Sequence, residues 1–318
     1  MNLESWPIRH LTEHAAIALA GLFGLLIVAS VLVKVLSLLH PARDYTELRQ
    51  RVNSWWLMVA IFSVALMAPS TISLLFFGLI SFLALKEYLT IIPTRRADRR
   101  VLFWAYLAIP FQYYWVSQAW FGMFIIFIPV YMFLLIPLRM ILIGETDGFL
   151  KAVGTLHWGL MITVFSLSHL AFLLVLPVER NPIGGGAGLV LFAMFLTQFN
   201  DVMQFVWGKL FGHHKIIPQV SPKKTWAGFV GGVMTTTMLA GFVGPWLTPL
   251  VGWESWFAGL LIGIAGFIGD VTISAVKRDL GIKDSGNLIP GHGGILDRVD
   301  SLTYTAPLFF HYLYYLHY

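Results

Sequence analysis

Acidic residues near the end of the chain have the spacing of a metal site. Asp297 and Asp300 are three positions apart after a glycine-rich segment at 291–294, so they share one face if a helix begins there. Asp270, in the preceding apolar run, can close the site from that helix. Carboxylate oxygens are the ligands that Mg²⁺ prefers, and the chain has no cysteine for a thiolate site. We therefore expect a Mg²⁺ site on these aspartates.

A charged stripe leads into this segment along one predicted helical face. Asp270, Ser274 and Lys277 recur at helical spacing, and Arg278 follows directly. A charge inside a membrane helix costs a few kcal/mol, so such residues usually serve a function. The alternative is a solvated loop in which the carboxylates pair with Lys277, Arg278 and Arg298.

A second basic segment runs into the apolar stretch that begins near residue 226. Ser221 and Thr225 supply hydroxyl groups, Lys223 and Lys224 supply charge, and a helix start supplies free backbone N–H groups. These features suit a triphosphate, so we expect a phosphate-binding cradle here. The alternative is a positively charged membrane anchor with an interfacial tryptophan.

Polar residues also follow one face of the apolar run at 187–211. Thr197, Asn200, Asp201 and Gln204 recur at helical spacing, which predicts the wall of a polar cavity. We expect Asp201 to take part in nucleotide binding. The alternative is that these side chains hydrogen-bond to neighbouring membrane helices.

The composition is that of a membrane protein with several spans. Of the 318 residues, 58% are apolar and 12% are charged, whereas soluble domains are about 25% charged. The apolar residues form runs of about 20, the length of a helix that crosses a bilayer. The predicted fold class is all-α and polytopic, with nine or ten transmembrane helices. The second run and the last could instead be interfacial. The runs lie near residues 15–39, 54–68, 70–92, 101–118, 121–143, 155–177, 187–211, 227–249, 254–278 and 302–317.

Basic residues in alternate loops predict the orientation in the membrane. These loops should face the cytoplasm of a bacterial inner membrane, together with the active site, and the N-terminus should lie outside. Orientation also explains the net charge of +5 better than nucleic-acid binding does. The first 150 residues otherwise point only to a scaffold, and Glu87, near one of these helix ends, is the exception; we expect it to pair with Lys86 or the arginines that follow. A glycine break at 184–186 divides a scaffold at 1–183 from a catalytic region at 184–318.

Together these motifs resemble the signature of the phosphatidate cytidylyltransferase family, the CDP-diacylglycerol synthases. The resemblance covers roughly residues 195–303. It rests on Ser274-x-x-Lys277-Arg278, Lys283-Asp284, Pro290-x-His292-Gly293-Gly294-x-x-Asp297-Arg298-x-Asp300 and Ser221-Pro222-Lys223-Lys224-Thr225-Trp226-x-Gly228.

The resemblance implies an enzyme that transfers CMP from CTP to phosphatidate, giving CDP-diacylglycerol and pyrophosphate. It also implies an all-helical membrane fold, a homodimer, and an essential divalent metal that a second cation could join. The candidate metal ligands are Asp270, Asp297, Asp300 and Asp284. The candidate nucleotide-binding residues are Ser221, Lys223, Lys224, Thr225 and Asp201. The other signature residues, assigned to catalysis beside Asp270 and Asp297, are Lys277, Arg278, His292 and Arg298.

Two departures from the family pattern suggest either a divergent branch with a different lipid acceptor or a weakly active paralogue. Ala227 stands where the family usually has glutamate, and Gln204 and Phe205 stand where it usually has alanine and tyrosine. A CTP-dependent kinase for an isoprenoid alcohol is an alternative with similar metal and phosphate sites. A transporter of an anionic substrate is another, because polar residues and glycine breaks in membrane helices also mark transport paths.

Overall fold

The computed structural model describes residues 11–41, 44–95, 98–286 and 293–318. Within these ranges the chain forms helices and contains no β-strand, which confirms the all-α prediction. The elements up to residue 180 are α1 (Glu13–Leu39), α2 (Thr46–Met67), α3 (Ser70–Ile91), α4 (Arg99–Ser117), α5 (Phe121–Ile126), η3 (Phe127–Met132), α6 (Phe133–Ile141), α7 (Phe149–Leu160), η4 (Met161–Phe165), α8 (Ser166–Val175) and η5 (Val178–Arg180). The later ones are α9 (Gly185–Phe211), α10 (Trp226–Leu247), α11 (Trp253–Asp279), α12 (Leu296–Val299) and α13 (Leu302–His317).

Seven helical stretches in the described part of the chain are long and apolar enough to cross a membrane. They are α1, α3, the continuous stretch α5–η3–α6, the continuous stretch α7–η4–α8, α9, α10 and α11. Helices α2, α4 and α13 lie at three of the other predicted runs but do not qualify. α13 has 16 residues, and α2 and α4 begin with polar or charged turns. The predicted number of nine or ten spans is therefore not confirmed.

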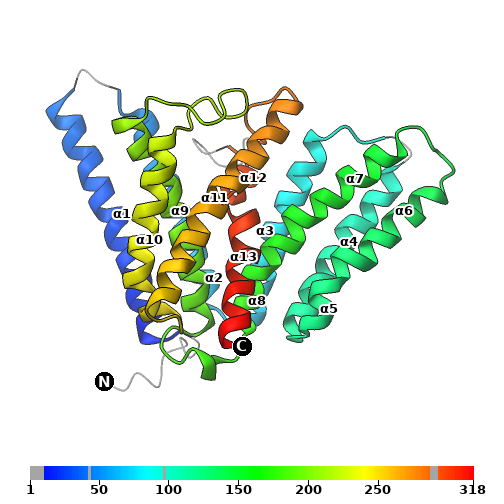
Figure 1. Cartoon of the computed structure of the whole chain (residues 1–318), viewed down its shortest axis with the longest axis horizontal. Helices are drawn as coiled ribbons and strands as arrows, with labels where there is room; N and C mark the ends of the chain where they lie inside the picture. The colour runs from blue at the N-terminus through cyan, green and yellow to red at the C-terminus, as the bar shows by residue number, and fades with distance from the viewer. Residues whose placement is uncertain (1–10, 42–43, 96–97, 287–292) are drawn as a thin grey trace.

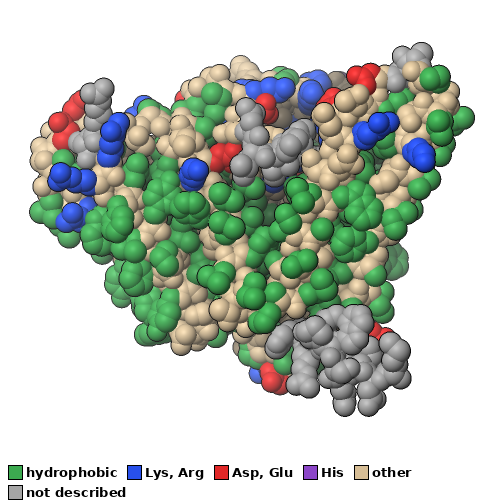
Figure 2. All heavy atoms as spheres, turned by 180° about the vertical axis from the view of Figure 1, so that it is seen from behind, with side chains coloured by type: hydrophobic (Ala, Val, Ile, Leu, Met, Phe, Trp, Pro, Cys, Tyr) green, Lys and Arg blue, Asp and Glu red, His purple; other side chains and the backbone are tan. Residues whose placement is uncertain are grey.

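The helices alternate in direction, so that the predicted basic loops gather at one end. α1, α3, α6, α9 and α11 all end there, whereas α13 ends on the opposite side (Figure 1). Figure 2 shows lysine and arginine side chains gathered toward the same end and apolar side chains over much of the remaining face. This distribution agrees with the alternation of basic loops that the sequence predicts.

Close contacts at glycines hold the C-terminal helices together. α10 packs along both α9 and α11 (Figure 1). A Cβ atom at Gly259 of α11 would lie 2.4 Å from the Cβ of Ala240 on α10. One at Gly232 of α10 would lie 2.5 Å from Cγ of Gln204 on α9. Small residues at such crossings are typical of membrane helices, whose association depends on close packing.

The last helix, α13, lies inside the bundle. Phe309 and Phe310 are fully buried, and α13 packs against α8, α9 and α11. Its Thr305 hydroxyl accepts a hydrogen bond from Thr197 of α9 at 3.0 Å. The interfacial alternative is therefore wrong for this segment, because its aromatic side chains fill the space between helices.

The two predicted regions share one apolar core. Leu85 and Tyr88 of α3 and Leu167 of α8 belong to the same buried cluster as Leu196 of α9 and Phe309 of α13. α8, from the first region, packs directly on α9 and α13. The division into a scaffold and a catalytic region stays a prediction.

Gly259→Ala tests the close packing of α10 and α11. The added methyl group would meet the Cβ of Ala240 and the Cα of Thr237 at 2.8 Å, so the helices must separate. We expect a loss of about 1–3 kcal/mol, seen as a lower melting temperature in detergent. Gly21→Ala in α1 is the matched control, because a Cβ atom there would have no heavy atom within 4 Å apart from its chain neighbours and the backbone of its own helix. Equal melting temperatures would contradict the packing.

Candidate active site

A polar cavity of about 430 Å³ opens where α9, α11 and α12 meet at the basic end of the bundle. We call it the acidic cavity, because five aspartates contribute to its wall, all of them candidate site residues from the sequence. It is lined by Arg51, Trp55, Gln198, Asp201, Val202, Phe205, Asp270, Lys277, Asp284, Asp297, Arg298 and Asp300. The structure thus brings Asp201 to the aspartates of the C-terminal motif.

Asp201, Asp270 and Asp300 form an acidic cluster in this cavity. Asp201 extends from α9, and its Oδ2 accepts a hydrogen bond from the Ser301 hydroxyl at 2.8 Å. Asp270 lies on α11, and Asp300 follows α12. A Cβ atom at Gly269 would lie 2.5 Å from the carbonyl oxygen of Asp300. This glycine therefore allows α11 to approach the turn that carries Asp300.

Lys224 supplies positive charge to the acidic cluster. Its Nζ lies 2.5 Å from Oδ2 of Asp270 and donates a hydrogen bond to Oε1 of Gln204 at 2.9 Å. Burial alone would lower the pKa of Lys224, but the charges of Asp270 and Asp201 raise it above its ordinary value. Burial and the same two carboxylates raise the pKa of Asp300 well above its usual value. The negative charge of the cluster is therefore not fully compensated.

Asp297 is held differently, in a buried ion pair with Lys277 of α11. Its Oδ1 lies 2.7 Å from Lys277 Nζ, and its Oδ2 accepts the backbone N–H of Ser285 at 2.9 Å and of Gly294 at 3.1 Å. Burial raises the pKa of Asp297, but the hydrogen bond and charge of Lys277 outweigh it and hold the pKa below its ordinary value. The alternative of a solvated loop is thus right that Asp297 pairs with Lys277. It is wrong that this pair is solvated, because Asp297 is buried.

The predicted stripe on α11 is confirmed in its first three members. The Ser274 hydroxyl donates to Oδ1 of Asp270 at 3.3 Å, and Lys277 continues the same face. Arg278 points elsewhere, because the next residue in a helix is rotated by about 100°. Its Nε donates to the carbonyl oxygen of Val220 at 3.2 Å, which ties α11 to the loop before α10. Arg278 does not line the acidic cavity.

The acidic cluster has the donor chemistry of a hard divalent cation. Its ligands are carboxylates, and Oδ1 of Asp201 is buried without a hydrogen-bond partner among the described residues. No group of three or more His, Asp or Glu side chains within those residues is arranged to hold a metal ion as it stands. Lys224 occupies one oxygen of Asp270 in this arrangement. The residue types fit Mg²⁺, and the metal site stays a prediction.

A second polar cavity, of about 310 Å³, lies between α9 and the start of α10. Asp201 and Phe205 line both cavities, so the two adjoin at these residues. We call it the lysine cavity, and its polar wall residues are Asp201, Gln204, Lys209, Lys215, Ser221, Lys223, Lys224 and Thr225. The structure therefore brings together all the residues predicted to bind the nucleotide.

The backbone at the start of α10 differs from the predicted cradle. The N–H of Gly228 donates to Thr225 Oγ1 at 3.1 Å, so Thr225 caps its own helix. The N–H of Trp226 donates to the carbonyl oxygen of His214 at 3.1 Å. The prediction of free backbone donors is wrong at these two positions, because the chain satisfies them locally. The anion-binding role of the lysines stays a prediction.

The polar face of α9 divides into two parts. Thr197 and Asn200 are fully buried between helices, and Asn200 Nδ2 donates to the carbonyl oxygen of Gly263 on α11 at 3.1 Å. Asp201 and Gln204 lie nearer the basic end and line the lysine cavity. The cavity prediction is therefore wrong for Thr197 and Asn200, which hydrogen-bond between helices as the alternative proposed.

Three signature residues of the C-terminal motif have different surroundings. Asp284 and Arg298 line the acidic cavity, although Asp284 is exposed and Arg298 is half-buried. His292 lies outside the described residues, so its role stays a prediction.

Sequence reasoning did not assign several residues that line these cavities. Arg51 and Trp55 come from α2, and Gln198 and Lys209 come from α9. Lys209 could have been found, because it lies eight residues after Asp201 and so on the same helical face. Arg51 carries no local indication of a site, because it follows the first span like any orienting arginine.

Glu87 of α3 also differs from its prediction. It pairs with neither Lys86, which is exposed, nor any described arginine. Instead its Oε2 accepts the backbone N–H of Leu296, the first residue of α12, at 2.6 Å. The predicted pairing is wrong because the side chain points under the C-terminal motif.

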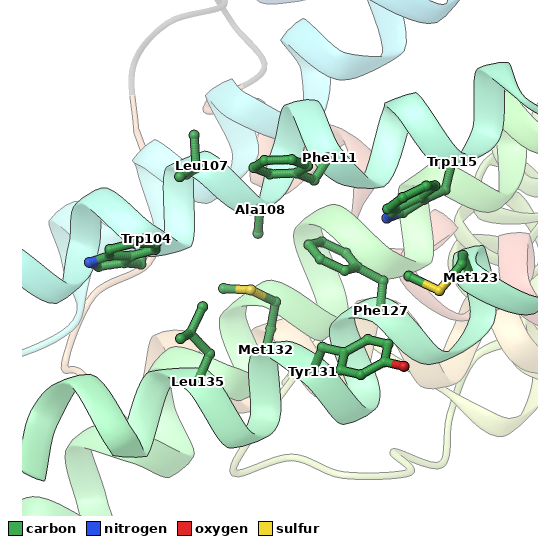
Figure 3. Close-up of a pocket in the computed structure, with 10 residues that line it drawn as sticks. All are labelled: Trp104, Leu107, Ala108, Phe111, Trp115, Met123, Phe127, Tyr131, Met132 and Leu135. Atoms are coloured by element: carbon green, nitrogen blue, oxygen red, sulfur yellow. The ribbon is translucent and has the colours of Figure 1, made fainter.

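An apolar cavity between α4 and the α5–η3–α6 stretch offers no such chemistry. Figure 3 shows the rings of Trp104, Phe111, Trp115 and Phe127 around it, together with Met132. None of its lining residues is charged. The acidic and lysine cavities are therefore the better candidates for the reaction site.

Comparison with known proteins shows the family of the chain. The model of the cytidylyltransferase family matches residues 49–316, which is most of the chain. An uncharacterised protein of Escherichia coli, YnbB, is 47% identical over 298 residues, which cover 94% of this chain and 98% of that protein.

Several similar proteins are named phosphatidate cytidylyltransferase. The one from Synechocystis is 47% identical over 115 residues, 36% of this chain and 39% of that protein. The one from Haemophilus influenzae is 41% identical over 135 residues, 41% of this chain and 46% of that protein. The matched part thus spans less than half the length of these two enzymes. With a family match over most of its residues and several membrane-crossing helices, the chain belongs to the cytidylyltransferase family and is a nucleotidyltransferase of the membrane.

Proposed function

We propose that this enzyme transfers CMP from CTP to phosphatidate, with CDP-diacylglycerol and pyrophosphate as products. The observation that carries the proposal is the position of the acidic cavity between two cavities of opposite character. It adjoins the lysine cavity at Asp201 and an apolar cavity at Gln198 and Arg298. A nucleoside triphosphate and a lipid could therefore meet at the acidic cluster. The names of the phosphatidate cytidylyltransferase relatives support the same pair of substrates.

The apolar cavity suits the acyl part of the lipid. It has a volume of about 370 Å³, and its walls come from α2, α3, α8, α9, α12 and the start of α13. Met58, Phe76, Ile80 and Met194 are among the apolar side chains that line it, and Arg298 lies where it meets the acidic cavity. An arginine at the polar end of an apolar cavity matches a phosphate attached to a hydrocarbon tail. We call it the lipid cavity.

The lysine cavity suits the triphosphate of CTP. Lys209, Lys215, Lys223 and Lys224 place four positive charges around one space, with the Ser221 hydroxyl beside them. Lysine is a common ligand of phosphate groups and acts as a point charge. Lys224 also contacts Asp270, so a phosphate bound to this lysine lies next to the acidic cluster.

In the proposed reaction, an oxygen of the lipid phosphate attacks the α-phosphorus of CTP. A bond forms between that oxygen and the phosphorus, the bond from the phosphorus to the oxygen bridging to the β-phosphate breaks, and pyrophosphate leaves with the electron pair. A phosphate monoester has a second pKa of about 6, so the attacking oxygen is ionised near neutral pH without a protein base. Positioning and charge stabilisation by Lys224, Lys277 and Arg298 then carry the catalysis.

We assign the Mg²⁺ ligands to the acidic cluster, Asp201, Asp270 and Asp300. Asp297 and Asp284 are further candidates, in particular if a second cation binds. The ion, when bound, supplies positive charge against the oxygens on which negative charge develops. This proposal extends the role of Asp201 from nucleotide binding to metal binding.

The orientation and assembly belong to the same proposal. The lysine and acidic cavities lie at the basic end of the bundle, which the positive-inside rule directs toward the cytoplasm, where CTP is made. A bacterial inner membrane is the proposed location. The homodimer implied by the family resemblance is retained as part of the proposal.

Pyrophosphate release from CTP by the purified enzyme tests the reaction. We expect release that requires both phosphatidate and Mg²⁺, and that falls by about 100-fold or more in Asp270→Asn and Asp297→Asn, because each removes a charge that the site uses. Asp279→Asn is the matched control, since Asp279 is exposed at the end of α11 and lines neither polar cavity. Release of CDP instead would point to the kinase, and movement of label across liposomes without CTP consumption to a transporter.

Met194→Trp tests the lipid cavity separately. The larger side chain should fill space in the lipid cavity, so we expect the KM for a long-chain phosphatidate to rise by about tenfold or more. The KM for CTP should change little, because the lysine cavity lies on the other side of Asp201. Met234→Trp is the control, since Met234 is exposed on α10. Equal effects of the two variants on both substrates would contradict this placement of the lipid.

A further inference from the structure

Glu87 is a carboxylate from the first half of the chain that lies beneath the C-terminal motif. Its Oε2 accepts the backbone N–H of Leu296 at 2.6 Å, across 209 positions of sequence. Leu296 directly precedes Asp297, and α12 packs on α3 at this contact. Glu87 does not line the acidic cavity, and its hydrogen bond to the motif is made to the backbone of this segment.

Gly294 of the motif and Gly286, which precedes the motif in the chain, make room for the Glu87 carboxylate. A Cβ atom at Gly294 would lie 1.6 Å from Oε1 of Glu87, and one at Gly286 would lie 2.0 Å from the same oxygen. At both positions the three nearest atoms all belong to Glu87. Neither glycine has a positive φ angle, so backbone conformation does not by itself demand glycine there. The space that these glycines leave is filled by one side chain, that of Glu87.

Asp297 hydrogen-bonds to the same backbone from the side of the cavity. Its Oδ2 accepts the N–H groups of Ser285 and Gly294, next to the positions that surround Glu87. The segment therefore lies between two carboxylates, Glu87 from α3 and Asp297 from α12. Asp297 is in turn fixed by Lys277 at 2.7 Å. A shift of the backbone at Gly294 or Leu296 would move Asp297 and the residues that follow it.

We propose that Glu87 is a positioning residue for the transfer reaction. It holds the backbone of the segment from Gly293 to Leu296, so that Asp297, Arg298 and Asp300 face the acidic cavity. The role in turnover rests on the proposed function, whereas the backbone contact does not. A displacement of about 1 Å at a reacting geometry can reduce turnover by about 100-fold, so one hydrogen bond at this place can control kcat.

A double-mutant cycle between Glu87 and Gly294 tests the proposal. We expect Glu87→Ala to lower kcat by about tenfold or more, with the KM for CTP and the melting temperature little changed. Gly294→Ala should lower kcat at least as much, because its methyl group meets the Glu87 carboxylate. The double variant should be no worse than Glu87→Ala alone, because the methyl group then enters the vacated space. Additive losses would overturn the proposal.

Two further variants separate positioning from simple stabilisation. Glu87→Gln keeps an oxygen that can accept the N–H of Leu296, so its kcat should stay within about threefold of the unmodified enzyme. Lys86→Ala is the neighbouring control and should leave kcat unchanged, since Lys86 is exposed. A Glu87→Ala protein that melts earlier but keeps the unmodified kcat per folded molecule would overturn the proposal.

Hydrogen exchange without substrates makes the result independent of the proposed reaction. In Glu87→Ala, peptides that cover the segment from Gly293 to Asp300 should exchange about tenfold faster or more, while peptides from the middle of α11 should not change. Glu87→Gln should exchange like the unmodified protein. Unchanged exchange in Glu87→Ala would overturn the contact. If exchange responds as expected and no phosphatidate-dependent pyrophosphate release occurs in the unmodified enzyme, the reaction assignment fails instead.

Discussion

Holding several carboxylates together at the end of a membrane bundle costs free energy, and much of the C-terminal structure offsets that cost. Burial and mutual repulsion both disfavour the ionised form, as the raised pKa of Asp300 reflects. Two lysines from different parts of the chain partly compensate this negative charge. Lys224, just before α10, contacts Asp270, and Lys277, near the end of α11, contacts Asp297. The close packing of α9, α10 and α11 at glycines brings these charges into one place.

The aspartates of the cavity differ in how many hydrogen-bond partners they have, a difference that the sequence motifs do not reveal. Asp297 has a partner on each oxygen, and removal of Lys277 would leave a buried charge uncompensated, which typically costs about 3–5 kcal/mol. Asp201 keeps one oxygen without a partner among the described residues. Asp297 is thus suited to organising the motif, and the acidic cluster is suited to receiving a cation.

The first half of the chain does more than fill the membrane. Arg51 and Trp55 reach the acidic cavity, α2 and α3 supply walls of the lipid cavity, and Glu87 supports the backbone before Asp297. Arg51 and Glu87 are charged side chains on helices that are apolar over much of their length. The family match, which begins at residue 49, includes these positions.

The sequence by itself determined the membrane class, the all-α fold and the family, because apolar run length and motif spacing are local properties of the chain. It also placed Asp270, Ser274 and Lys277 on one face, since helical periodicity decides that. Only the tertiary structure decided that Glu87 binds the backbone of Leu296, and that Thr197 and Asn200 bond to neighbouring helices while Asp201 reaches the cavity. These outcomes depend on which helices become neighbours and how deeply they pack, and no periodicity within one segment contains that information.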